Sequence, residues 1–295
     1  MTGRTEAAQA VHLRRGGEHA TAMTDPPKPP APWAASGRHD GRPPPLGATL
    51  VLLVLWMTLT ALGVMPVDLA AQSPLGALGQ PPIPQVLALV LMLGAIGVFG
   101  WRGIGLGRAV PGTARLMWLP WLYLPLFALA MLAAGGAPPL AVLLPMALVM
   151  LLVALSEELM FRGLLYPALR QRLRVWPAIW TSSALFGAVH LLNALRHGDW
   201  AASGTQAVTA TGTGLLLIAL RLRRGSIWPA VLYHMLWNIG VFGMAANTPE
   251  GPLTAPLPPT EPATLILPAL LVVPNVVYAL FLLRRARDGD LPGDR

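Results

Sequence analysis

Two adjacent glutamates and an arginine lie inside a long apolar run, and they are the residues of this sequence best suited to chemistry. The pair is Glu157 and Glu158, and Arg162 follows the second of them by four residues. The stretches 140–155 and 164–169 on either side are almost entirely apolar. A charge at the centre of a membrane helix costs about 2.5–3.5 kcal/mol on insertion scales, so charges kept there usually serve a function.

The spacing of these three residues predicts a different role for each glutamate. On a helix, Glu158 and Arg162 are an i, i+4 pair with the acid on the N-terminal side, which is the better orientation. Glu157 is turned by about 100° from its neighbour and has no cation at that spacing. We therefore expect Arg162 to neutralise Glu158, while Glu157 faces another partner. A purely structural ion-pair cluster at a helix end is the alternative.

A few other polar side chains lie in apolar segments further along the chain. His190 stands in one segment, with Asn193 as a further candidate three residues later. His234 and Asn238 are at i and i+4 in another, so they share one helix face. Each alone is more often a hydrogen-bonding group between helices. Together with Glu157 they supply what a hydrolytic site requires: a base, orienting groups and donors for an oxyanion.

Other hydrolytic mechanisms lack their residues in this sequence. The chain has no cysteine, and neither Gly-x-Ser-x-Gly nor His-Glu-x-x-His occurs. No aspartate lies in any of the segments predicted below to span the membrane, which excludes a pair of catalytic aspartates. A water molecule activated by glutamate remains.

Composition predicts an all-α polytopic membrane protein. The chain of 295 residues is 54% hydrophobic and 12% charged, whereas soluble domains carry about 25% charged residues. We expect about eight transmembrane helices, each of about 20 residues. They are predicted at Leu46–Met65, Ile83–Trp101, Leu116–Ala134, Leu140–Leu165, Pro177–Leu195, Thr205–Leu222, Ile227–Ala246 and Thr264–Leu283.

The positive charges predict the orientation of these helices. With the N-terminus in the cytoplasm, all 21 Lys and Arg residues except Arg196 fall on the cytoplasmic side. This pattern explains the net charge of +8 without a nucleic-acid partner. Residues 1–45 are predicted to be a disordered cytoplasmic tail, 46–285 the transmembrane domain, and 286–295 a short cytoplasmic tail. The Pro-rich loop Asn247–Pro262 then lies outside.

Three motifs on separate helices resemble those of the CPBP family. They are Glu157-Glu158-x-x-x-Arg162, Phe186-x-x-x-His190 and His234-x-x-x-Asn238. The CPBP family contains type II CAAX prenyl endopeptidases and bacterial proteins for bacteriocin processing and immunity. The resemblance covers residues 140–246, which we take as the catalytic core.

The resemblance implies an intramembrane endopeptidase with eight helices and an active-site cavity within the membrane. It implies that Glu157 and His190 activate water, that His234 and Asn238 stabilise the oxyanion, and that Glu158 and Arg162 organise the site. A metal ion, zinc or another divalent cation, is an open question for such enzymes. If one is present, its ligands would be Glu157, His190 and His234; the site could equally work without metal.

The implied partners are a peptide or protein substrate at the membrane and the lipid bilayer. A non-catalytic scaffold or bacteriocin-immunity protein of the same fold is the alternative function, and a transporter with a buried ion site is a third. The single lysine, Lys28, beside many Arg, Ala, Gly and Pro residues indicates a GC-rich, bacterial coding sequence. We therefore expect the protein in a bacterial cytoplasmic membrane, with both termini in the cytoplasm.

Overall fold

The computed structural model describes residues 42–62, 82–133, 135–245 and 262–288, and all regular secondary structure in these ranges is helical. This confirms the prediction of an all-α protein. The predicted Asn247–Pro262 loop and most of both predicted tails lie outside these residues. In chain order the helices are α1 (Leu46–Met57), a π-helical segment (Thr58–Leu62), α3 (Ile83–Phe99), a 3-10 turn (Ala114–Met117), α4 (Trp118–Ala133), α5 (Leu140–Glu158), a second π-helical segment (Leu159–Leu165), α6 (Tyr166–Arg170), α7 (Val175–Ala188), a 3-10 segment (Val189–Asn193), α8 (Ala194–His197), α9 (Trp200–Arg224), α10 (Trp228–Ala245) and α12 (Pro262–Leu283).

Three continuous helical stretches in the described residues are long and apolar enough to cross a membrane. They are Ala114–Ala133, Leu140–Arg170 and Val175–Asn193. Three shorter apolar helices, Leu46–Thr60, Ile83–Phe99 and Pro268–Leu283, also correspond to predicted spans. The helical content and these apolar helices fit an integral membrane protein, while the number of eight spans stays a prediction.

The helix that carries the two glutamates changes its winding immediately after them. α5 ends at Glu158, a π-helix of seven residues follows, and every one of these seven residues is buried. Pro167, in the first turn of α6, has no N–H to donate to the carbonyl of Gly163 as a regular α-helix would require. The chain nevertheless stays helical to Arg170, five residues beyond the predicted end of this span. Single π-helical turns are often found at functional sites because they alter which side chains face a neighbouring helix.

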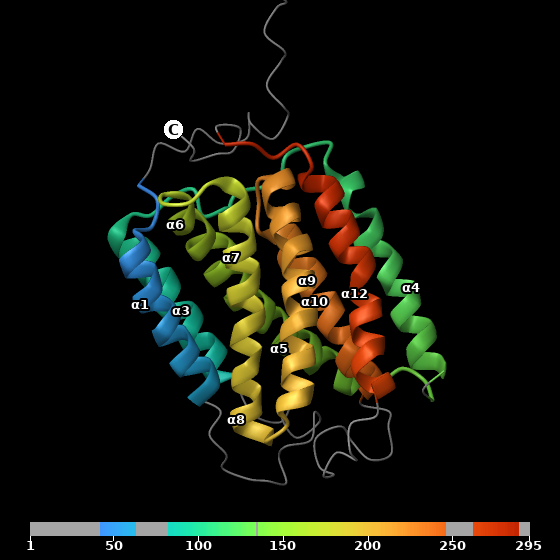
Figure 1. Cartoon of the computed structure of the whole chain (residues 1–295). Coiled ribbons are helices and arrows are strands. Elements are labelled where there is room, and N and C mark those ends of the chain that lie inside the picture. The colour runs from blue at the N-terminus through green and yellow to red at the C-terminus, as the bar shows by residue number, and fades with distance from the viewer. Residues whose placement is uncertain (1–41, 63–81, 134, 246–261, 289–295) are drawn as a thin grey trace, which may run out of the picture. The chain divides into compact units, whose positions relative to one another are not determined.

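Helix α9 lies between several other helices and brings their functional residues together. It packs against α7 on one side and α12 on the other, as Figure 1 shows, and it also contacts α10. Small residues allow the close approach, as is common between membrane helices. A Cβ at Gly187 of α7 would come within 2.0 Å of Thr211 Oγ1, and one at Gly212 would come within 2.6 Å of Val272 Cγ1 on α12.

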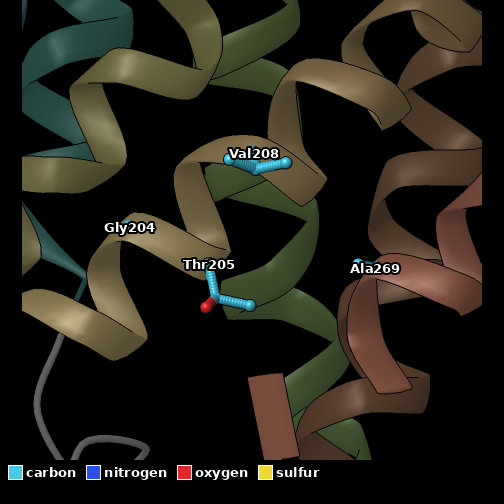
Figure 2. A pocket seen from close by; sticks show the side chains of 4 residues that line it. All are labelled: Gly204, Thr205, Val208 and Ala269. Atoms are coloured by element: carbon cyan, nitrogen blue, oxygen red, sulfur yellow. The ribbon is translucent and has the colours of Figure 1, made fainter. Parts of the chain in front are cut away.

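The N-terminal part of α9 is packed less tightly against α12. Gly204, Thr205 and Val208 line a shallow pocket with Ala269 of α12 (Figure 2). A Cβ at Gly204 would meet no atom within 4 Å. The pocket contains none of the candidate site residues in its lining.

A glycine-rich loop before α4 fastens the turn between α9 and α10. The carbonyl of Gly103 accepts a hydrogen bond from Arg221 Nη2 at 2.9 Å, and that of Gly105 accepts from Ile227 N at 2.9 Å. Gly105 has a φ of +82°, a left-handed conformation that favours glycine. The same loop reaches the π-helix, since a Cβ at Gly163 would lie 3.2 Å from the Ile104 carbonyl oxygen.

Residues next to the first and last helices fasten the turn between α6 and α7. Gln171 Nε2 donates to the Pro44 carbonyl at 2.6 Å, just before α1. Asp288, just after α12, accepts a hydrogen bond from Val175 N at 2.7 Å and pairs with Arg170 at 3.1 Å. Its carboxylate thus binds the first N–H group of α7, which no residue within that helix can do.

Candidate active site

Glu158 is at the centre of the buried polar cluster. Its Oε1 accepts a hydrogen bond from Arg162 Nη1 at 2.9 Å and lies 2.9 Å from His234 Nδ1 on α10. Glu158 is 0% exposed and Arg162 1%. The predicted i, i+4 pair is therefore present, and the structure adds a histidine from a distant helix as the second partner of the same oxygen.

The guanidinium of Arg162 is held by three helices. Besides Glu158, Nη2 donates to the carbonyl of Gly214 on α9 at 3.2 Å. Its Cζ lies 4.1 Å from the centre of the Phe186 ring of α7, so the cation stacks on an aromatic face. A fully buried charge requires such contacts because it has lost its water.

His234 lies between the two glutamates. A carboxylate can only accept hydrogen bonds, so the short contact with Glu158 places a proton on Nδ1. The other ring nitrogen, Nε2, lies 3.6 Å from Glu157 Oε2. Glu157, with 15% of its side chain exposed, is more accessible than Glu158. The structure thus places His234 of α10 beside Glu157, and the role of Glu157 stays a prediction.

His190 is oriented by its own helix and by Phe186. It lies in the 3-10 segment that follows α7, and its Nδ1 is 2.9 Å from the carbonyl oxygen of Phe186. That carbonyl can only accept, so Nδ1 carries a proton, and in the neutral ring Nε2 is the hydrogen-bond acceptor. The Phe186 ring meets His190 edge-on at 5.2 Å and His234 at 5.8 Å between ring centres. One aromatic ring therefore contacts both histidines of the predicted site.

The two asparagines differ in their surroundings. Asn238 lies one turn after His234 on α10 and is partly buried. Asn193 donates through Nδ2 to Gln206 Oε1 of α9 at 2.8 Å. The structure thus ties Asn193 to α9 by an amide pair, rather than to the glutamates.

The suggested metal ligands do not form a metal site. Within the described ranges, no three His, Asp or Glu side chains are grouped so that they could hold a metal ion. Glu157, His190 and His234 can act in this arrangement as acids, bases and hydrogen-bonding groups.

Gly214 is the contact that sequence reasoning missed. It lies at the end of the Gly- and Thr-rich part of the predicted sixth span, where nothing marked one glycine above the others. Its role depends on a backbone carbonyl and on a missing side chain, and neither has a signature in a single sequence.

Comparison with known proteins gives one match, in the part of the chain that holds this cluster. Residues 139–240 match the family described as type II CAAX prenyl endopeptidase Rce1-like. No curated protein and no solved structure matches the chain. The matched segment contains all three motifs, from Glu157 through His190 to Asn238. The match over residues 139–240 therefore supports the resemblance of this segment to the CPBP family of intramembrane proteases.

Proposed function

We propose that this protein is an intramembrane endopeptidase that hydrolyses a peptide bond of a membrane-associated substrate with a water molecule activated by Glu157. The unequal environments of the two glutamates carry the proposal. Glu158 Oε1 is occupied by Arg162 and His234. The second oxygen of each glutamate, Oε2, is buried and accepts no hydrogen bond from the described residues, but 15% of the Glu157 side chain is exposed whereas Glu158 is fully buried. Glu157 is therefore the carboxylate that water can reach, and with His234 Nε2 at 3.6 Å it is suited to take a proton from water.

The remaining residues have distinct roles in this proposal. The free Nε2 of His190 accepts a hydrogen bond from the attacking water and orients it. Water adds to the peptide carbonyl carbon while Glu157 takes its proton. That proton then passes to the leaving amine as the carbon–nitrogen bond breaks, which leaves a carboxylic acid and an amine that then exchange a proton to give a carboxylate and an ammonium group.

Stabilisation of the oxyanion requires hydrogen-bond donors at the carbonyl oxygen. The side-chain amide of Asn238 is one such donor. His234 can serve as a second only through Nε2, because Nδ1 is already bound to Glu158. In this role Nε2 carries a proton of its own, and the proton taken from water stays on Glu157 until it passes to the leaving amine.

The substrate class follows from the location of the site and from the family. The matched family is one of CAAX prenyl endopeptidases; for this chain we propose a peptide or protein substrate held at the membrane. We also retain the proposed bacterial cytoplasmic membrane and cytoplasmic termini, which the positive-charge pattern supports.

The test is comparative analysis of membrane peptides from cells that express the wild type or Glu157→Gln. This change keeps the shape of the side chain and removes the base, so peptides released by the wild type should be absent. The same isosteric change at Glu250, outside the family match, is the control and should leave cleavage intact. Synthetic, internally quenched versions of the identified substrate then give rates for purified protein.

With such a substrate, Asn238→Ala should lower kcat by about 10²–10³, the usual loss for one oxyanion donor. Wild-type cleavage by purified Glu157→Gln would overturn the mechanism and favour a non-catalytic role, such as that of an immunity protein or scaffold.

A further inference from the structure

The contacts around Arg162 point to a residue outside the three motifs. We propose that Gly214 is a positioning residue: its carbonyl and its lack of a side chain hold the Arg162 guanidinium, and through it Glu158 and His234, in the arrangement needed for catalysis. Only the effect of Gly214 on catalysis rests on the proposed function. Its effect on the arrangement of Arg162, Glu158 and His234 can be tested without a substrate.

A series of buried contacts connects Gly214 to His234. Gly214 O accepts from Arg162 Nη2 at 3.2 Å, Arg162 Nη1 donates to Glu158 Oε1 at 2.9 Å, and the same oxygen lies 2.9 Å from His234 Nδ1. Each link is buried, so water cannot replace a displaced partner. A displaced guanidinium would therefore shift Glu158 Oε1, which is the oxygen that accepts the hydrogen bond from His234 Nδ1.

The surroundings of Gly214 leave little space for a side chain. A Cβ there would lie 3.1 Å from Arg162 Nη2 and 3.2 Å from Phe186 Cδ1. Both distances are shorter than ordinary van der Waals contact, so each neighbour would have to move by a few tenths of an ångström. The guanidinium has little freedom to move, since the Phe186 ring covers one face and Glu158 binds one edge. Phe186 in turn contacts both histidines.

Helix α9 contains two matched controls for a glycine-to-alanine change. A Cβ at Gly204 would meet nothing within 4 Å. A Cβ at Gly212 would come within 2.6 Å of Val272 Cγ1, a closer contact than any at Gly214, but on the side of α12. The three variants share one helix and one chemical change. Gly212→Ala therefore measures general damage to α9 packing, and Gly204→Ala measures the substitution itself.

The experiment records the ¹⁵N spectrum of histidine-labelled protein in lipid nanodiscs. The chain has six histidines, and a His234→Gln variant identifies the signals of His234. Its two ring nitrogens report which one carries the proton and whether Nδ1 keeps its acceptor. We expect Gly214→Ala to shift the His234 signals, while Gly204→Ala and Gly212→Ala leave them as in the wild type. Unchanged His234 signals in Gly214→Ala, or an equal shift in Gly212→Ala, would overturn the proposal.

A second arm tests whether the effect passes through Arg162. In an Arg162→Lys background an ammonium group replaces the planar guanidinium that donates to the Gly214 carbonyl and stacks on Phe186. Gly214→Ala should then shift His234 less than in the wild-type background, with only the part that passes through Phe186 remaining, and an undiminished additional shift would contradict the route.

With an identified peptide substrate, Gly214→Ala should lower kcat about tenfold, because a misplacement of about 1 Å can cost about 10²-fold and the expected movement is a few tenths of an ångström. KM should stay within about twofold, because no contact with substrate is removed. A change in KM alone would contradict positioning. If the wild type cleaves no peptide, the proposed function fails, whereas the His234 spectra still decide the role of Gly214.

Discussion

Replacement of Arg162 by alanine tests the buried cluster most directly. The substitution removes the cation that pairs with Glu158, which is itself 0% exposed. It also removes the group that stacks on Phe186 and binds the Gly214 carbonyl. A carboxylate would remain in the interior with His234 Nδ1 as its neighbour.

The magnitude follows from these contacts. Loss of one partner of a buried ion pair costs about 3–5 kcal/mol, mostly because the remaining charge is uncompensated. The contact of Glu158 with His234 is retained, which favours the lower end of this range. The cavity left by the guanidinium lowers the free energy of unfolding further. We therefore expect Arg162→Ala to lower the free energy of unfolding by about 4 kcal/mol.

A second substitution separates charge from packing. Glu158→Gln in the Arg162→Ala background removes the lone charge but keeps an oxygen that can accept from His234. The double variant should regain about 1–2 kcal/mol relative to the single one, because the cavity remains but the buried charge does not. Arg172→Ala, at an exposed arginine two residues beyond α6, is the control and should change stability by less than about 0.5 kcal/mol.

Reversible unfolding in mixed micelles with increasing SDS gives these free energies, and the ten tryptophans supply a fluorescence signal. A double variant no more stable than Arg162→Ala alone would refute the argument, since the loss would then come from packing and not from a lone charge.

Two further predictions concern the segments that fasten the bundle. Gly105→Ala should destabilise the protein by about 2 kcal/mol more than Gly103→Ala. Both have a positive φ, but only at Gly105 would a Cβ strike Arg221, at 2.3 Å from Nε. Equal losses in the SDS titration would show that this contact does not matter. Asp288→Ala should cost about 0.5–2 kcal/mol, as for loss of a helix cap, and should speed hydrogen exchange of the Val175 amide, whose acceptor it removes. Unchanged exchange at Val175 would contradict the capping role.

Sequence alone was sufficient for interactions within one helix. The pairing of Glu158 with Arg162 depends only on a separation of four residues, and the structure has it at 2.9 Å. The same spacing left Glu157 without a partner on its own helix, and the three motifs identified the family that residues 139–240 match. Helical periodicity fixes these relations locally, so they can be predicted before any packing is known.

Hydropathy was less informative for helices buried by other helices. α9 is not among the stretches apolar enough to count as spans, although residues Gly212–Leu222 are all buried. A helix surrounded by protein needs small residues for close contact more than it needs long apolar side chains. The Gly- and Thr-rich half of α9 therefore lowers the hydropathy of this helix, although α9 packs against α7, α10 and α12.

Only the tertiary structure decided which groups complete the cluster. Glu158 binds a histidine 76 residues away, Arg162 binds a carbonyl 52 residues away, and Phe186 contacts both histidines. These contacts depend on how far each helix is rotated and shifted along its neighbour. The π-helix after Glu158 and the glycines of α9 set those rotations and distances. Spacing along one chain determines which residues share a face, whereas side-chain packing between helices determines which faces meet.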